Sequence, residues 1–155
     1  MKRFLLLAAV ILGLCNLCAV QAKPNIKDGL YRIVAIDTVP AQQTPLPRHS
    51  TAVFFSKLFE DYNDGEYNRL IIDTSEFVPL ELEKAPTTEQ QTENKKKLLL
   101  SLTQEASEQL KTFTAKHVRQ RVALVVDGEA LTMHKIREAL TSGQLQITRC
   151  NDNAC

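Results

Sequence analysis

The spacing of hydrophobic residues changes several times between Lys97 and Arg149, and the order of these changes predicts alternating strands and helices. Residues 98–102 form a short apolar run typical of a buried strand. Thr103 is placed to cap a helix that follows, because its hydroxyl can accept a backbone N–H bond of the first turn. Four residues at spacings of four, three and four predict the buried face of that helix: Ala106, Leu110, Phe113 and His117.

The second part of this region predicts a hairpin, a helix and a strand. The apolar run 122–126 ends at Asp127-Gly128, a pair that favours a tight turn, and the return strand begins at residue 130. Met133, Ile136 and Leu140 recur at helical spacing, so we expect a second helix over 133–140. Gly143 ends it, and residues 145–148 form the last strand. The order β-α-β-β-α-β predicts an α+β, ferredoxin-like unit over about residues 97–149.

The chain before this unit predicts an additional β-rich portion, residues 23–84. Alternating apolar and polar positions indicate four strands, at residues 29–37, 51–56, 68–74 and 78–83. Pro79 cannot donate to a strand ladder, so the last of them is expected at a sheet edge or bulge. Residues 85–96 have no apolar pattern and are expected to form an exposed polar linker.

The first 22 residues have the pattern of a signal peptide. Lys2 and Arg3 precede the apolar run 4–14, and small residues lie at the cleavage spacing before Lys23. We therefore expect export to the periplasm and a mature chain that begins at Lys23. An uncleaved anchor is an alternative. Lipidation at Cys15 or Cys18 is another alternative, but it is disfavoured because each cysteine follows a leucine rather than a small residue.

The amino-acid composition limits the kinds of binding partner that we expect. Hydrophobic residues make up 44% of the 155, and there is no Trp. Without Lys2 and Arg3 the chain has 17 basic and 18 acidic residues, a net charge of −1, so no overall field attracts nucleic acid or anionic lipid. We expect a protein or polypeptide partner, no nucleic acid, and membrane contact only peripherally or through an uncleaved or lipidated N-terminus.

Cys150 and Cys155 remain as a pair after removal of the leader. Four residues separate them, which suffices for a small loop, and an oxidising compartment favours a disulfide over residues 150–155. A redox-active pair usually has two intervening residues, and a zinc site would need two further ligands that no nearby spacing supplies.

Catalytic chemistry has little support in the sequence. His49, His117 and His134 are well separated, and no metalloprotease, nucleophile-elbow or phosphate-loop pattern occurs. Asp127 has a sufficient structural role in its turn. We expect a protein that is not an enzyme and that uses no cofactor.

Several motifs together resemble a known family. Four motifs occur in the order found in the head subdomain of SecD. They are Leu102-Thr103 before an acidic helix start, Thr114-Ala115-Lys116 near the helix end, the apolar strand closing on Asp127-Gly128, and Ile147-Thr148. SecD is the accessory subunit of the bacterial protein-export translocase. The resemblance implies a periplasmic binding module that contacts exported or unfolded polypeptides. SecD also uses transmembrane helices, and no span is expected after residue 22, so this chain is not a complete translocase motor.

Two surfaces are candidates for partner binding in this interpretation. One is the sheet edge near residues 78–83 and the other is the expected second helix, since sheet edges and helix faces both pair with polypeptides. The candidate residues are Val78, Leu80, Leu82, Met133, His134 and Arg137. The competing hypotheses are a structural envelope protein, or an enzyme or metal-binding factor that uses His117, His134 and the cysteine pair.

Overall fold

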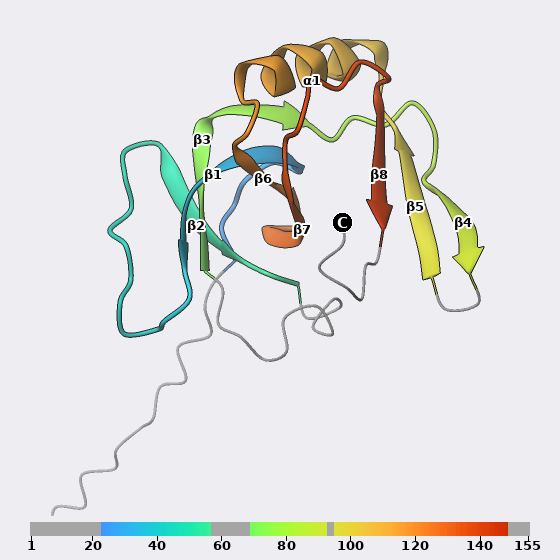
Figure 1. Ribbon diagram of the computed structural model, residues 1–155. Helices are drawn as coiled ribbons and strands as arrows, with labels where there is room; N and C mark the ends of the chain where they lie inside the picture. The colour runs from blue at the N-terminus through green and yellow to red at the C-terminus, as the bar shows by residue number, and fades with distance from the viewer. Residues whose placement is uncertain (1–22, 57–68, 93–94, 149–155) are drawn as a thin grey trace, which may run out of the picture.

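The computed structural model describes residues 23–56, 69–92 and 95–148 (Figure 1). In these ranges it contains one helix and eight strands, arranged in two antiparallel sheets. The elements are β1 (Gly29–Asp37), β2 (Ser50–Phe54), β3 (Arg69–Pro79), β4 (Thr87–Thr92), β5 (Lys95–Ser101), α1 (Gln104–Lys116), β6 (Arg121–Val126), β7 (Glu129–Lys135) and β8 (Gln144–Thr148).

The larger sheet has five strands in the order β2-β3-β1-β6-β7 and curls until its outer strands meet. The contact between them follows directly after β2. Phe55 forms a parallel bridge with Ala130 of β7, and the backbone N–H of Ser56 donates to the Ala130 carbonyl at 2.9 Å. A curled sheet encloses one face and leaves the other for a covering layer.

Strand alternation supplies a hydrophobic core on each face of the curled sheet. On β6, Ala123 and Val125 point to the enclosed core, whereas Val122 and Leu124 point to the outer core beneath α1. The enclosed core consists of Tyr31, Ile33, Val53, Leu70, Ile72, Ala123, Val125 and Ala130. The outer core consists of Leu30, Val78, Leu100, Leu102, Ala106, Leu110, Phe113, Val122, Leu124 and Ile136.

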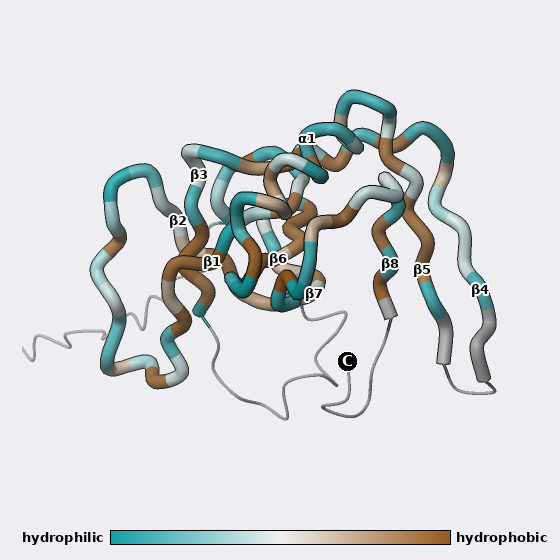
Figure 2. Tube along the Cα trace, turned by 45° about the horizontal axis from the view of Figure 1, so that its top comes forward, coloured by the Kyte–Doolittle hydropathy of each residue, from teal (hydrophilic) through white to brown (hydrophobic). Residues whose placement is uncertain are grey.

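The smaller sheet has the order β4-β5-β8 and lies beside the curled sheet (Figure 1). Two backbone bonds connect the segment after β3 to the end of β5: the N–H of Glu83 donates to the Ser101 carbonyl, and the N–H of Thr103 donates to the Glu81 carbonyl. The hydrophobic half of β5 lies toward α1 (Figure 2). The smaller sheet therefore contributes one hydrophobic end to the outer core.

Helix α1 and the following hairpin confirm the sequence-based predictions. The hydroxyl of Thr103 accepts the N–H of Ala106 at 3.3 Å, which caps the helix. The predicted apolar face is buried in full, His117 included. Asp127 and Gly128 have φ values of 51° and 74°, as the tight turn between β6 and β7 requires.

The predicted second helix over 133–140 is wrong. Residues 129–135 form β7, which pairs with β6 from Val126↔Glu129 to Arg121↔Lys135, and no helix follows it before β8. Hairpin pairing outweighed a short helical spacing, because a register shift in the β6–β7 pairing brings both Ala130 and Met133 to the face that packs on the enclosed core. The second half of the chain thus follows the order β5-α1-β6-β7-β8, and a β-α-β-β-α-β ferredoxin-like unit is not confirmed. The described residues are mostly antiparallel sheet with one helix.

The expected polar linker, residues 85–96, is also not free of structure. It contains β4 and the first residues of β5, which pair from Thr87↔Leu99 to Thr92↔Lys95. In addition, β1 pairs with β6, so residues before and after this segment share the larger sheet. The division at residues 84 and 97 stays a prediction. The signal peptide, the turn at 61–65 and the cysteine loop lie outside the described residues.

Candidate functional site

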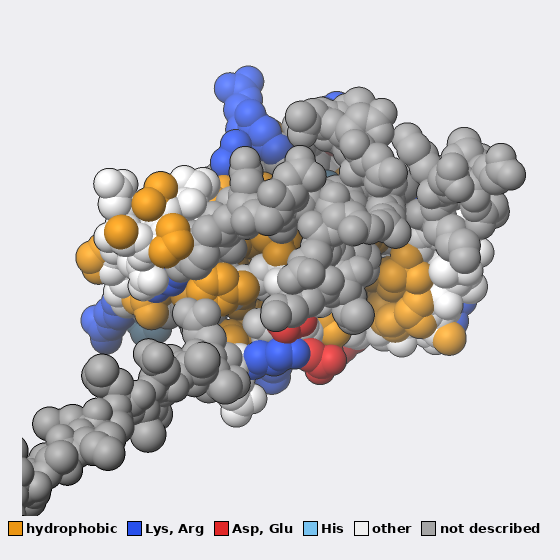
Figure 3. All heavy atoms as spheres, turned by 90° about the horizontal axis from the view of Figure 1, so that it is seen from below, with side chains coloured by type: hydrophobic (Ala, Val, Ile, Leu, Met, Phe, Trp, Pro, Cys, Tyr) orange, Lys and Arg blue, Asp and Glu red, His pale blue; other side chains and the backbone are white. Residues whose placement is uncertain are grey.

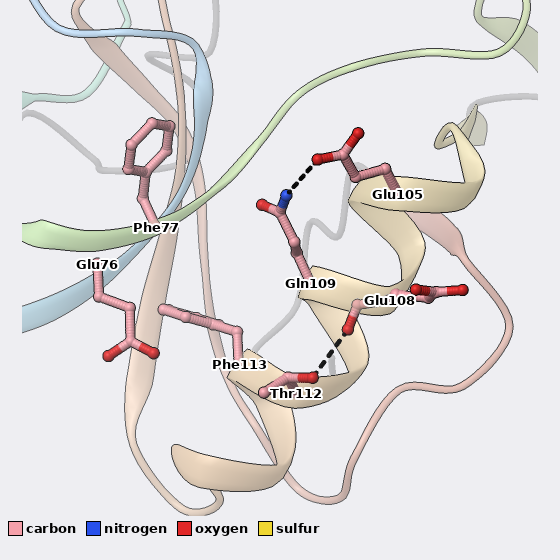
Figure 4. Close-up of a pocket in the computed structure, with 7 residues that line it drawn as sticks. All are labelled: Glu76, Phe77, Glu105, Glu108, Gln109, Thr112 and Phe113. Carbon is pink, nitrogen blue, oxygen red and sulfur yellow. Dashed lines mark hydrogen bonds between the residues drawn. The ribbon is translucent and has the colours of Figure 1, made fainter.

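A cleft of about 450 Å³ lies between α1 and the second half of β3 (Figure 4). Strand β2 pairs with β3 only from Arg69 to Asp73, so on the side away from β1 the later residues of β3 have no described strand beside them and lie next to the helix. We call this cleft the α1–β3 groove. Its lining residues are Glu76, Phe77, Glu105, Glu108, Gln109, Thr112 and Phe113.

Two aromatic side chains provide the apolar part of the α1–β3 groove. Phe113 is buried in the outer core beneath α1. Phe77 lies on β3, packs in part against the enclosed core and stacks on Tyr31 of β1, with ring centroids 4.9 Å apart and ring planes 6° from parallel. Gly29 makes this stack possible, because a Cβ there would lie 2.5 Å from the Val78 carbonyl oxygen and 2.9 Å from a Phe77 ring carbon.

Three carboxylates give the groove a negative rim. Glu105 lies in the first turn of α1, where an acid is stabilised by the helix dipole, and Glu108 follows one turn later. Glu76 accepts from the Lys116 ammonium at 2.6 Å. The hydrogen bond from Lys116 outweighs partial burial and lowers the pKa of Glu76, so this carboxylate stays ionised at neutral pH.

His117 lies at one end of the groove and is 7% exposed. Its Nδ1 is 3.2 Å from the Gln120 side-chain oxygen, and its Nε2 is 3.4 Å from a Glu76 oxygen without an aligned hydrogen bond. The ring also packs against Phe113, with centroids 4.7 Å apart. These contacts make His117 a packed residue that closes the C-terminal end of α1.

The candidate residues on β3 and after it are largely internal. Val78 is 1% exposed and belongs to the outer core. Leu80 and Leu82 are partly buried against the same core, and Leu82 bridges to Leu102. Their role in partner binding stays a prediction, and Val78 offers no surface for direct contact.

The candidate residues between positions 133 and 137 divide between two environments. Met133 is partly buried against the enclosed core. His134 and Arg137 are exposed, on β7 and on the segment after it. The His134 Nε2 lies 2.8 Å from the Thr132 hydroxyl, and partial burial lowers the pKa of His134. The three do not share a helix face, because that helix does not form.

Metal binding was part of a competing hypothesis. Within residues 23–56, 69–92 and 95–148, no group of three or more His, Cys, Asp or Glu side chains is arranged to hold a metal ion. His117 and His134 belong to different elements, and Cys150 and Cys155 lie outside these ranges.

A polar cluster that sequence reasoning missed fixes the loop between β1 and β2. Asp37 is buried and accepts from the Arg69 guanidinium at 2.7 Å and from both the N–H and the hydroxyl of Thr44. The Thr44 hydroxyl, with Arg69, lowers the pKa of Asp37 despite burial. The loop exposes Val39 and Leu46, and hydrophobic side chains gather at the left in Figure 3, where this loop lies.

The groove residues were also missed, for a physical reason. In the sequence alone, Glu105 fits a favourable interaction with the helix dipole, Glu108 lies off the apolar face of the helix, and Glu76-Phe77 falls between the strands expected at 68–74 and 78–83. The available signal was the alternation across Glu76, Phe77 and Val78, which continues a single strand through Pro79.

Together, the two sheets, the single covering helix and the acidic, aromatic groove define a small, mostly β domain within the described residues. The SecDF P1 head subdomain family matches residues 57–154. The chain belongs to this family. Among the described residues, no helix is long and apolar enough to cross a membrane.

Comparison with individual proteins and solved structures finds similarity over less than half of this chain. No curated protein matches this chain. A crystal structure of SecDF in its super-membrane-facing form is 26% identical, with a TM-score of 0.42, over 48% of this chain and 10% of that chain. A structure of SecDF, a membrane component that enhances protein export, is 27% identical, with a TM-score of 0.40, over 44% of this chain and 33% of that one. The match thus spans about a tenth of the chain in the first structure and about a third of the chain in the second.

Proposed function

We propose that the protein is a non-enzymatic, exported binding module that contacts translocating or unfolded polypeptides during protein export. Family membership over residues 57–154 supports this role. Residues 1–22 act as the signal peptide in this proposal, the mature domain works in the periplasm, and Cys150 and Cys155 form a disulfide. The partners are exported chains or subunits of the translocase.

The α1–β3 groove is the polypeptide-binding surface in this proposal. Phe77 is partly exposed and offers apolar contact area, whereas Phe113 is buried beneath the groove and supports its floor. Aromatic side chains dominate the energy of polypeptide interfaces. Glu105 and Glu108 are exposed at the rim, and their charges favour a basic partner. A segment that combines basic and apolar side chains matches both features.

Binding is tested with residues 23–155 and a short fluorescent peptide of alternating leucine and lysine, measured by fluorescence anisotropy. The Glu105→Gln/Glu108→Gln variant should weaken binding about threefold to tenfold, since each exposed charge contributes about 0.2–1 kcal/mol. High salt should weaken peptide binding to the wild type by a similar factor and binding to the variant by less, because salt screens the charges that the variant lacks.

The matched control is Glu83→Gln/Glu138→Gln, which removes the same charge from exposed positions outside the groove. It should bind as the wild type does. A Phe77→Leu variant, checked for folding by circular dichroism, should bind more weakly while keeping the wild-type salt dependence. Equal losses in the groove variant and its control would contradict the proposal, and so would unchanged binding in both groove variants.

A further inference from the structure

The second half of β1 has an open edge. The pairing of β1 with β6 ends at Arg32↔Val122, whereas its pairing with β3 continues to Asp37↔Arg69. Among the described residues, therefore, no strand pairs with Ile33–Ile36 on the side opposite β3. A strand edge without a partner presents backbone donors and acceptors to another chain.

The connection between α1 and β6 explains why the edge is open. Arg119 has a φ of 70°, and its N–H donates to the Ile136 carbonyl at 2.8 Å. Gln120 in turn accepts from the N–H of Ile136 at 2.9 Å. These bonds hold the entry to β6 against the end of the β7 segment, so β6 begins at Arg121 and does not extend along the rest of β1.

A groove of about 500 Å³ follows this edge. Its lining residues are Arg32, Ile33, Val34, Ala35, Ile36, Gln120 and Arg121. Five consecutive strand residues line it, although their side chains alternate between the two faces of the sheet. The groove therefore runs along the backbone edge and not over one face, and Val34 is 37% exposed beside it.

The charges along the groove beside β1 determine which polypeptide side chains it favours. Arg32 and Arg121 are its ionisable lining residues, and no carboxylate lines it. Arg32 already pairs with Asp73 at 2.5 Å, while Arg121 is exposed and has no ion pair among the described residues. A second copy paired through the same edge would bring arginine against arginine, which disfavours self-association.

We propose that the Ile33–Ile36 edge binds an extended polypeptide segment with acidic side chains, which adds as a strand beside β1. Backbone hydrogen bonds hold the added strand, and Arg121 selects acidic side chains. The site is separate from the α1–β3 groove, so it stands whether or not that groove binds polypeptide. Register shifts at Tyr31/Ile33 and Ile33/Ala35 bend β1 and limit the length of the added strand to a few residues.

The experiment uses residues 23–155 and a peptide of alternating glutamate and valine, with NMR to follow the backbone amides of residues 33–36. Strand addition should slow hydrogen exchange at amides within this range. A peptide with alternate amides N-methylated keeps its side chains but cannot pair along its backbone, and it should bind at least about tenfold more weakly.

The role of charge is tested with Arg121→Glu. This variant should bind the acidic peptide at least about fivefold more weakly and bind a lysine–valine peptide more tightly. Lys84→Glu, an equal charge change at an exposed position outside the groove, should leave both affinities unchanged. The proposal is overturned by equal binding of the N-methylated peptide, or by protection that maps outside residues 33–36. Protection that appears without peptide and grows with protein concentration would also overturn it, since a second copy would then occupy the edge.

Discussion

Replacement of Thr114 tests how α1 is connected to the irregular segment between β7 and β8. The Thr114 side chain is fully buried, and its hydroxyl donates to the Leu110 carbonyl at 2.7 Å. The same hydroxyl accepts the N–H of Leu140 at 2.9 Å. Thr114→Val keeps the shape of the side chain but leaves this N–H without its acceptor.

The expected cost follows from that one unpaired group. A buried donor without a partner costs about 1–3 kcal/mol. Leu140 itself is partly exposed, so water can replace some of the lost bond, and we expect the free energy of unfolding to fall by about 1–2 kcal/mol. Urea unfolding, followed by circular dichroism, measures this change.

Hydrogen exchange separates the hydrogen bond from packing. In Thr114→Val the Leu140 amide should exchange about fivefold to thirtyfold faster, because its local protection is lost. Thr114→Ser is the matched control: it loses a buried methyl group, at about 1 kcal/mol, but keeps the acceptor for Leu140. An unchanged Leu140 exchange rate in Thr114→Val, or an equal increase in Thr114→Ser, would refute the reasoning.

Two further predictions concern acid stability and a glycine. Burial raises the pKa of Asp73, but hydrogen bonds from Ser75 and Arg32 outweigh it and lower the pKa to about 2, below the unfolded value of 3.8. The ionised Asp73 therefore contributes about 1 kcal/mol to the free energy of unfolding, because the pair is partly exposed. This contribution is present above pH 4 and is lost as pH falls from about 4 to 2. Asp73→Asn should remove that part of the acid dependence, measured by urea unfolding at each pH. Gly143 has a φ of 62°, and its added Cβ would lie 2.3 Å from the Ser107 hydroxyl oxygen, so Gly143→Ala should lower the melting temperature. Adding Ser107→Ala should restore part of the loss, and a double variant no more stable than Gly143→Ala would contradict the clash.

Patterns that depend on neighbouring residues predicted much of the fold. The Thr103 cap, the buried face of α1 and the Asp127-Gly128 turn all follow from local rules, and all are present. The hairpin between β6 and β7 followed from the same turn. Local backbone preferences and local periodicity agree at these positions, so few alternatives compete.

Predictions that depended on distant residues failed. Met133, Ile136 and Leu140 fit a helical spacing, but pairing with β6 decided the structure of residues 129–135. Residues 87–92 look like a linker by composition, yet they pair with β5 as an outer strand, where polar side chains are well solvated. The α1–β3 groove joins residues from two elements that are far apart in sequence. Local alternation indicates a single strand through Pro79, but no local pattern places that strand beside α1.

Binding of exported polypeptides in the α1–β3 groove is the proposal to test most directly. Site-specific photocrosslinking of the full chain, exported in bacterial cells, tests it with a photoreactive amino acid at Gln109, in the groove, or at Lys111, on the exposed side of the same helix. We predict that Gln109 captures exported chains or translocase subunits, that blocking translocation increases this capture, and that Lys111 captures few. Equal capture from both positions, or capture that does not respond to the translocation block, would contradict the account.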